Sequence, residues 1–318
     1  MKSINNISIA IVIPTLNRER VLLDTVDSVL KLDPLPDEIF VIDQSVNHEP
    51  DTENYLQKIK DFGVTVVRLP KPGVCFARNL GAALSNSDII IYLDDDVIIE
   101  DPAFIEKHRR NYNNTEITAV QGQILLPDIS IKDASIGSRN CINMFEYRTR
   151  LENISTFVTA HVSIRRSVLL QTGGFDEGFS GRTYANEDGD FGLRLFKSGY
   201  RIDFDPAVNL IHLRTPSGGN RLVGRDVFSE WTRSVTFFQF FLRHYKGWLR
   251  IWKILTVFSL IAFRKENVMG PWRIPGALLH SLYAFNLAIK RHRVGFRSSI
   301  FNPGIDYLRQ KFLAGSTR

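Results

Sequence analysis

The sequence predicts an α/β protein whose mostly parallel sheet is flanked by helices. Apolar runs of strand length alternate with segments of helical periodicity through roughly the first hundred residues. This order, with short loops, favours right-handed crossovers and parallel strands. The run Ile89–Leu93 contains only apolar residues, which is typical of a strand buried on both faces. Three carboxylates, Asp94 to Asp96, follow it directly.

The expected elements begin with a buried strand over residues 7–13, which Pro14 stops because proline cannot continue a ladder. An amphipathic helix follows, with Leu22, Val26 and Val29 on its inner face. The other expected strands are residues 38–42, 64–68, 118–124, 157–164 and 208–211. The other expected helices are residues 51–60 and 76–84, with shorter ones from residues 165 and 187.

The acidic triplet predicts a divalent metal site. Open α/β sheets bind ligands at the carboxyl ends of their strands, and adjacent carboxylates repel one another unless a cation lies among them. Oxygen ligands favour Mg²⁺ or Mn²⁺. The alternative is a solvated acidic loop or the start of the next helix.

Other polar residues follow strands that end at the same edge. Thr15, Asp43 and Arg78 are expected to converge there with the triplet. Asp43 as a turn residue and Arg78 as a surface arginine are the alternatives. The chain has no GxGxxG after the first strand and no GxxxxGK[ST], which argues against a Rossmann dinucleotide site and a P-loop.

The second half adds two further candidates. Glu187 and Asp188 open a helix after a glycine-rich approach, although the helix dipole alone would favour acids there. His212 follows the last expected strand and is a candidate third metal ligand, or else a structural histidine. Residues 214–225 are polar, basic and glycine-rich, which indicates a lid that closes over an anion.

Charge is unevenly distributed. The net charge is +6, but residues 231–318 hold 15 Lys and Arg against two acids, which is +13 and leaves −7 for the remainder. The two cysteines give no disulfide framework, which suits a reducing cytoplasm, and the first nine residues lack a secretory pattern.

The basic tail predicts helices that lie on an anionic membrane surface. Residues 231–242 and 248–263 are apolar and aromatic, but their longest uncharged run, 254–263, is too short to span a bilayer. Trp231, Trp248 and Trp252 would lie near the headgroups. A helical hairpin packed on the rest of the protein or on a dimer partner is the alternative, and nucleic acid is a weaker one. We therefore expect a catalytic domain over residues 1–230 and a helical region over 231–318.

Six motifs follow one another along the chain: IVIPTLNR (11–18), VIDQS (41–45), ARNLGAAL (77–84), YLDDD (92–96), GGFDEGF (173–179) and NEDGDFGLRL (186–195). Their order resembles that of the family 2 glycosyltransferases of the GT-A fold, over about residues 7–215. The resemblance implies the nucleotide-diphospho-sugar transferase fold. It also implies inverting transfer of a sugar from a UDP-, GDP- or dTDP-sugar with Mg²⁺ or Mn²⁺, and a saccharide or lipid-linked acceptor in cell-surface glycan synthesis.

The resemblance also implies roles for individual residues. The nucleotide-binding set is Pro14, Thr15, Asp43, Arg78, Asp94 and Asp95; the metal-binding set is Asp96 and His212; the catalytic pair is Asp188, as general base, and Glu187. Two departures are Gln44, where the family often has a second acid, and His161, where it often has Asn. The implied location is the cytoplasmic face of the cell membrane. A sugar-phosphate nucleotidyltransferase, a non-catalytic sugar-nucleotide-binding scaffold and a homo-oligomer stay open.

Overall fold

The computed structural model describes residues 7–127, 149–179, 185–216, 218–219, 227–263 and 265–301. The strands are β1 (Ile9–Thr15), β2 (Glu38–Asp43), β3 (Val64–Arg68), β4 (Ile89–Leu93), β5 (Val97–Ile98), β6 (Ile117–Leu125), β7 (His161–Arg165) and β8 (Arg201–His212). The helices are α1 (Arg20–Val29), α2 (Pro50–Lys58), α3 (Val74–Leu84), α4 (Phe104–Asn111), α5 (Arg166–Thr172), α6 (Glu187–Lys197), α7 (Val227–His244), α8 (Gly247–Ala262), α9 (Lys265–Val268) and α10 (Ile274–Val294).

These strands form one sheet in the order β3-β2-β1-β4-β7-β6-β8-β5. The first four, β3 to β4, are parallel to one another. β7 then runs antiparallel to both of its neighbours, β6 and β8 are parallel, and β5 runs antiparallel to β8. The predicted mostly parallel sheet flanked by helices is therefore confirmed, with the antiparallel strands confined to β7 and β5.

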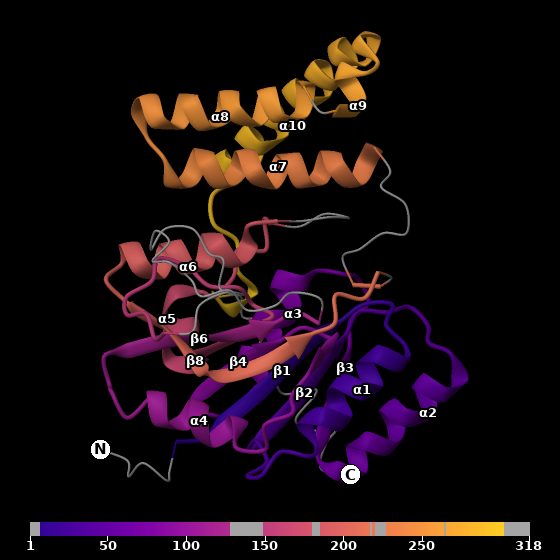
Figure 1. The fold of residues 1–318 in the computed structure, drawn as a ribbon, viewed down its shortest axis with the longest axis vertical. Coiled ribbons are helices and arrows are strands. Elements are labelled where there is room, and N and C mark those ends of the chain that lie inside the picture. Colours follow the sequence, from indigo (N-terminus) through magenta and orange to yellow (C-terminus); the bar gives the residue numbers. More distant parts are fainter. Residues whose placement is uncertain are drawn as a thin grey trace.

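Helices cover both faces of this sheet (Figure 1). In β1, Ala10 and Val12 pack on the face covered by α3, α5 and α6, whereas Ile9, Ile11 and Ile13 pack on the face covered by α1, α2 and α4. A strand that is buried on both faces reads as a continuous apolar run, which is why β1 and β4 stand out in the sequence.

The last strand is longer than expected. The predicted strand at residues 208–211 is only the end of β8, which begins at Arg201. Asp203 interrupts the apolar pattern, although it is buried and its carboxylate accepts from Arg150 and Arg201. A buried ion pair of this kind hides a strand from a reading based on hydrophobic periodicity.

Helices α7, α8 and α10 form a layer with an apolar core of its own, which contains Val235, Phe238, Val257 and Ala284. Figure 1 shows this layer on the side of α6 away from the sheet. No helix within the described residues is long and apolar enough to cross a membrane.

Candidate active site at the carboxyl ends of the strands

A cavity of about 660 Å³ opens where β1 and β4 end. The loop after β1, the start of α3, the residues after β4 and the start of α6 all contribute to its wall, and Arg233 of α7 closes one side. Parallel strands that end at one edge produce a crevice of this kind. Eight of the predicted site residues line it: Pro14, Thr15, Arg78, Asp94, Asp95, Asp96, Glu187 and Asp188.

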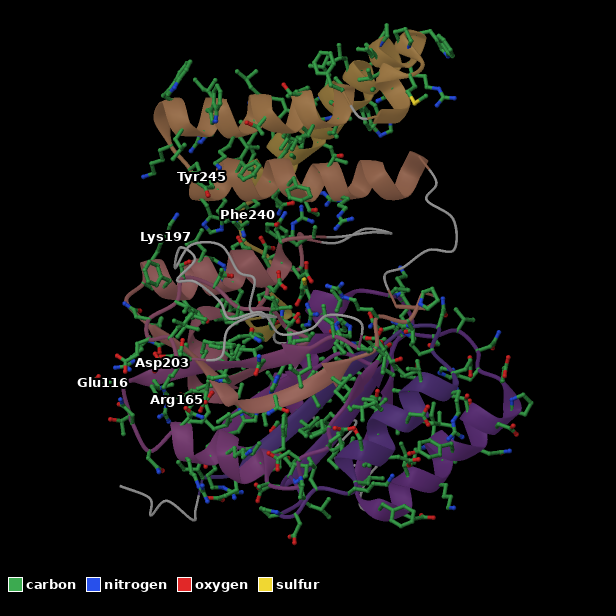
Figure 2. All side chains as sticks on the ribbon, viewed as in Figure 1. Glu116, Arg165, Lys197, Asp203, Phe240 and Tyr245 are labelled. Carbon is green, nitrogen blue, oxygen red and sulfur yellow. The ribbon has the colours of Figure 1, made fainter. Side chains whose placement is uncertain are left out.

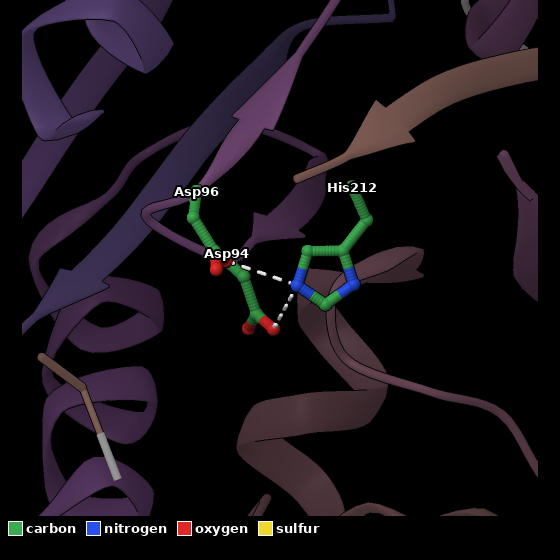
Figure 3. Close-up of side chains that lie close together, drawn as sticks. All are labelled: Asp94, Asp96 and His212. Atoms are coloured by element: carbon green, nitrogen blue, oxygen red, sulfur yellow. Dashed lines mark hydrogen bonds and ion pairs between the residues drawn. The ribbon is translucent and has the colours of Figure 1, made fainter. Parts of the chain in front are cut away.

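A candidate metal centre adjoins the cavity. One carboxylate oxygen each of Asp94 and Asp96 and a ring nitrogen of His212 lie within 4.8 Å of one another (Figure 3). Nε2 of His212 is 2.9 Å from Oδ1 of Asp96 and 3.8 Å from Oδ2 of Asp94. Two carboxylates and one imidazole suit Mn²⁺ or Mg²⁺. The sequence assigned Asp96 and His212 to the metal and Asp94 to the nucleotide, whereas the structure brings all three together.

His212 reaches this position because β8 pairs with the short strand β5. His212 is the register partner of Val97, the residue that follows Asp96. The amide of Leu213 donates to the carbonyl of Asp96 at 2.9 Å. Asp96 and His212 are more than a hundred residues apart in sequence, but the pairing of β5 with β8 makes them neighbours.

Arg18 supplies the acidic triplet with a cation from within the chain. Its Nε is 3.1 Å from Oδ1 of Asp95 and its Nη2 is 3.1 Å from Oδ2 of Asp96. Its Nη1 also donates to the hydroxyl of Thr215. All three charged side chains are nearly inaccessible to solvent. Arg18 belongs to the first sequence motif, but no role could be predicted for it, because nothing local shows that a loop arginine is buried.

The two buried carboxylates of the triplet, Asp95 and Asp96, differ in their pKa. Burial raises the pKa of Asp95 to about 6, although Arg18 opposes the rise. Burial would also raise the pKa of Asp96, but the hydrogen bond and charge of His212, with Arg18, hold it well below its usual value. Asp96 therefore stays ionised under all ordinary conditions, as a metal ligand must.

Arg18 and its partner Asp96 also hold the loop after β8. Thr215 donates from its backbone amide and its hydroxyl to Oδ2 of Asp96, at 3.0 and 2.9 Å. The amide of Gly219 donates to the carbonyl of Leu16 at 2.7 Å, and a Cβ at Gly218 would lie 2.5 Å from Cδ of Arg18. The segment predicted as a lid is thus tied to the β1 end where it is described, and residues 217 and 220–225 lie outside the described part.

Arg78 links the acidic triplet to the predicted catalytic pair. Its Nη1 is 3.2 Å from Oε1 of Glu187 and its Nη2 is 3.9 Å from Oδ1 of Asp94. The guanidinium also lies over the ring of Phe175. Arg78 is 4% exposed, so it is not the surface arginine of the alternative interpretation.

Glu187 and Asp188 enter the cavity from the first turn of α6. Burial raises the pKa of Glu187 to about 7, and the neighbouring Asp188 carboxylate adds to the rise while Arg78 opposes it. Burial also raises the pKa of Asp188, against the charge of Arg78. A carboxylate with a raised pKa is a stronger base at neutral pH, which suits proton abstraction.

Asp43 ends β2 beside the cavity but is not among the residues that line it. Its Oδ1 accepts from the amide of Ser45 at 2.9 Å, and its Oδ2 lies 3.1 Å from Nε2 of His48 and 3.3 Å from Nε of Arg68. Its role in nucleotide binding stays a prediction. Gln44 lines the cavity instead.

Gln44 holds two walls of the cavity together. Its Nε2 donates to the carbonyl of Thr15 at 3.2 Å, and its Oε1 accepts from the amide of Gly73 at 2.7 Å. An acid here could not donate to the β1 carbonyl.

His161 is not a substrate contact. It is fully buried, its Nδ1 is 3.0 Å from the carbonyl oxygen of Gln123, and its Nε2 is 3.1 Å from Nε2 of His108. Its ring stacks on Phe104 of α4, which covers the opposite face of the sheet from α6. The departure at this position therefore changes the core between the sheet and α4.

Two further cavity residues escaped the sequence reading. Asn186 directly precedes the predicted catalytic pair with φ at +66°, an uncommon conformation that asparagine tolerates, and its buried Nδ2 has no hydrogen-bond partner among the described residues. Arg233 comes from α7, which a domain division at residue 230 separates from the site. Such strained or orphaned groups concentrate at functional sites.

Residues 10–173, just over half of the chain, match the model of glycosyl transferase family 2. The O-antigen biosynthesis protein RfbC of Myxococcus xanthus is 24% identical over 225 residues, 66% of this chain and 17% of that protein. The uncharacterized glycosyltransferase YwdF of Bacillus subtilis is 26% identical over 219 residues, 67% of this chain and 76% of that protein. The uncharacterized protein y4gI of Sinorhizobium fredii is 26% identical, and the match spans 25% of its length. The match therefore spans a quarter or less of RfbC and y4gI.

Solved glycosyltransferases share the fold. Staphylococcus aureus TarS 1–349, solved with UDP-GlcNAc, superposes with a TM-score of 0.59 at 13% identity and covers 88% of this chain and 81% of its own. The mannosyltransferase PcManGT of Pyrobaculum calidifontis, solved with GDP-Man and Mn²⁺, gives 0.51 at 16% identity, with 97% and 85% covered. These likenesses confirm the GT-A fold.

Proposed function

The chain belongs to glycosyl transferase family 2 and is a glycosyltransferase, and on that premise we propose that it is a metal-dependent, inverting enzyme. The donor is a UDP-, dTDP- or GDP-sugar. The acceptor is a hydroxyl of a lipid-linked or saccharide molecule in cell-surface glycan synthesis, at the cytoplasmic face of the cell membrane. Relatives that carry UDP-GlcNAc or GDP-Man with Mn²⁺ support the donor class, and the O-antigen relative supports the pathway class.

The observation that carries this proposal is the set of groups gathered at one cavity. Asp94 and Asp96 line it with His212 beside them, Asp188 lines it too, and Arg78 contacts both Asp94 and Glu187. A nucleoside diphosphate requires cations for its charge, and an acceptor hydroxyl requires a base on the opposite face of the sugar. One cavity supplies both.

The reaction is a single displacement at the anomeric carbon. The bond from that carbon to the diphosphate oxygen breaks as the bond to the acceptor oxygen forms, and the acceptor proton passes to the carboxylate of Asp188. A bound Mg²⁺ or Mn²⁺, held by Asp94, Asp96 and His212, would neutralise the charge that develops on the departing nucleoside diphosphate. When Glu187 and Asp94 are both ionised, Arg78 is the cation that pairs with each of them.

The test is Asp188→Asn. It should leave binding of UDP-GlcNAc or GDP-mannose nearly unchanged in calorimetry with Mn²⁺, while release of nucleoside diphosphate from the productive donor falls by about 10²- to 10⁴-fold. The matched control is Asp61→Asn, which alters an exposed aspartate in the turn after α2. Near-normal turnover in Asp188→Asn would refute the assignment of the base.

A further inference from the structure

The helical layer presents an apolar surface to solvent. The outer surface is defined here by the exposed apolar residues of α8, of the α9 connection and of the first half of α10: Trp248, Trp252, Leu255, Trp272, Leu279 and Leu282. The three tryptophans are 73%, 57% and 75% exposed. A contiguous apolar surface rimmed by polar residues is unusual on a monomer and marks an interaction site.

In α8 the usual arrangement of a surface helix is reversed. The positions of α8 that face solvent carry aromatic, aliphatic and small hydroxyl side chains, whereas its two charged residues, Arg250 and Lys253, are only partly exposed. A helix on the surface of a globular protein normally turns its charged face to water. The opposite face of α8 is already satisfied, since Val257 lies in the core of the layer.

The described charged side chains around the outer surface are all basic; Glu266 of α9, the one acid in the sequence between residues 233 and 301, has no described side chain. Lys246, before the first turn of α8, and Arg273, before the first turn of α10, are exposed beside the outer surface, while Lys290 and Arg293 are exposed at the far end of α10. No acidic residue occurs among the described side chains from residue 233 to residue 301. Exposed aromatic residues with basic residues around them are the composition of a surface that binds anionic lipid.

A basic cavity of about 790 Å³ lies at the edge of the outer surface, between the end of α6 and the turn from α7 to α8. Lys197 and Tyr245, labelled in Figure 2, line it together with Lys246 and Leu249. The Nζ of Lys197 donates to the carbonyl of His244 at 2.7 Å, and burial together with the charge of Lys246 lowers the pKa of Lys197. Two cations at the rim of an apolar face suit the phosphate of a lipid headgroup.

We propose that the outer surface docks on an anionic lipid bilayer, with the tryptophans at headgroup level and the basic cavity at the boundary. A second copy of the chain is the less favourable occupant. In a two-fold contact the same surface meets itself, so two surfaces with basic residues beside them would be opposed, with no carboxylate among the described side chains of the layer to offset their charge.

Docking on lipid deepens the proposed function. Only the consequence for the acceptor rests on that function. α7 lies between the outer surface and the active site: Arg233 lines the active-site cavity, and the hydroxyl of Thr236 accepts from the amide of Ala185 at 3.2 Å. Two helices, α8 and α7, therefore separate the cavity from the lipid, a distance of about two helix diameters or roughly 20 Å. An acceptor anchored in the membrane by a lipid could reach it.

The test is flotation of the full chain with vesicles of equal parts phosphatidylglycerol and phosphatidylcholine, compared with pure phosphatidylcholine, without donor or metal. All four tryptophans of the chain lie between residues 231 and 272, so intrinsic fluorescence should shift to the blue when anionic vesicles are added. Replacing Lys246 and Arg273 by Ala should weaken binding about fivefold for each charge removed.

A matched pair of triple variants tests the apolar contribution. Trp252→Ser, Leu255→Ser and Trp272→Ser together should abolish flotation. Leu35→Ser, Val46→Ser and Phe62→Ser together alter equally exposed apolar residues outside the helical layer and should leave it intact. Both sets are exposed, and unfolding temperatures within a few degrees of the parent show that the variants fold.

Several outcomes would overturn the proposal: equal binding to neutral and anionic vesicles, no binding to either, or equal loss in the two triple variants. A dimer in solution that the Trp252, Leu255 and Trp272 variant dissociates, without vesicle binding by the parent, would assign the surface to a second copy. Because lipid binding is measured without substrate, its failure is independent of the Asp188→Asn result.

Discussion

Replacing Arg18 by Met should destabilise the protein through its acidic triplet. Methionine fills much of the same volume but leaves Asp95 without the cation 3.1 Å away and removes one of the cations of Asp96. Removing one partner of a buried ion pair typically costs about 3–5 kcal/mol, because the other charge stays buried. Asp96 keeps His212 and Thr215, so the lower end of that range is expected.

The deficit should depend on pH. With Arg18 present, burial already raises the pKa of Asp95 to about 6. Without Arg18 it should rise further, so Asp95 takes up a proton in the folded state at moderately acidic pH. A raised folded-state pKa gives stability at low pH that is lost as pH rises through that pKa. The loss in Arg18→Met should therefore be larger at about pH 8 than at about pH 5.

Urea unfolding at both pH values measures the deficit, and the midpoint temperature of thermal unfolding should fall by about 4–5 °C for a loss of about 3 kcal/mol in a chain of this size. Arg20→Met is the matched control, since Arg20 forms an exposed ion pair with Asp24 on α1 that should contribute less than about 1 kcal/mol. Mn²⁺ should restore part of the loss. A deficit no larger than that of Arg20→Met, or one independent of pH, would refute the role given to Arg18.

Three further changes test the site and the core around it. The reaction rate at low donor concentration should fall as the pH drops below about 7. Burial raises the pKa of Glu187 to about 7 and also raises the pKa of Asp188, which must be ionised to act as a base. A flat rate profile between about pH 5 and 8 would exclude this pair. His212→Ala should weaken Mn²⁺ binding, measured by calorimetry, on the order of tenfold or more, since even a group that only supports a metal ligand contributes that much. An unchanged Mn²⁺ affinity would show that His212 is not part of the metal centre. Gly122→Ala should cost about 1–3 kcal/mol or more in urea unfolding, because its Cβ would lie 2.0 Å from the ring of His161, whereas Gly276→Ala meets open space and should not destabilise.

The ends of the parallel strands could be predicted from the sequence, and with them most of the cavity. A strand buried on both faces gives an unbroken apolar run, so the polar residue that ends it is conspicuous, as Asp94 is after Leu93. All such ends in a parallel sheet lie at one edge. That reasoning placed Thr15 and Asp94 in one cavity without any information on their distance.

Pairings between distant segments could not be predicted. The contact of Arg78 with Glu187 spans 109 residues, and that of Arg18 with Asp96 spans 78. Nothing in a loop or on a helix marks an arginine as buried until the opposing carboxylate is placed. The sequence reading therefore attributed the neutralisation of the acidic triplet to a metal alone, whereas Arg18 also contributes to it.

Composition alone could not distinguish whether the two apolar helices of the tail, α7 and α8, pack on protein or bind a membrane. Both α7 and α8 are apolar on most sides, and a helix of that kind must be covered on most sides. In α7 one stripe, Val235, Phe238 and Leu242, packs in the core of the helical layer, while Phe240 and Arg243 face the catalytic body.

On that second face, Arg243 pairs with the buried carboxylates of Asp176 and Asp190, so α7 is covered by protein on both sides. α8 is covered only on the face that packs in the core of the helical layer. Val257 meets the core of the layer, but Trp248, Trp252 and Leu255 on its remaining surface are exposed, and within the described part of the chain they stay more than half accessible to water. The difference between the helices is therefore one of unsatisfied apolar surface, which is the physical reason to expect lipid at α8 and not at α7.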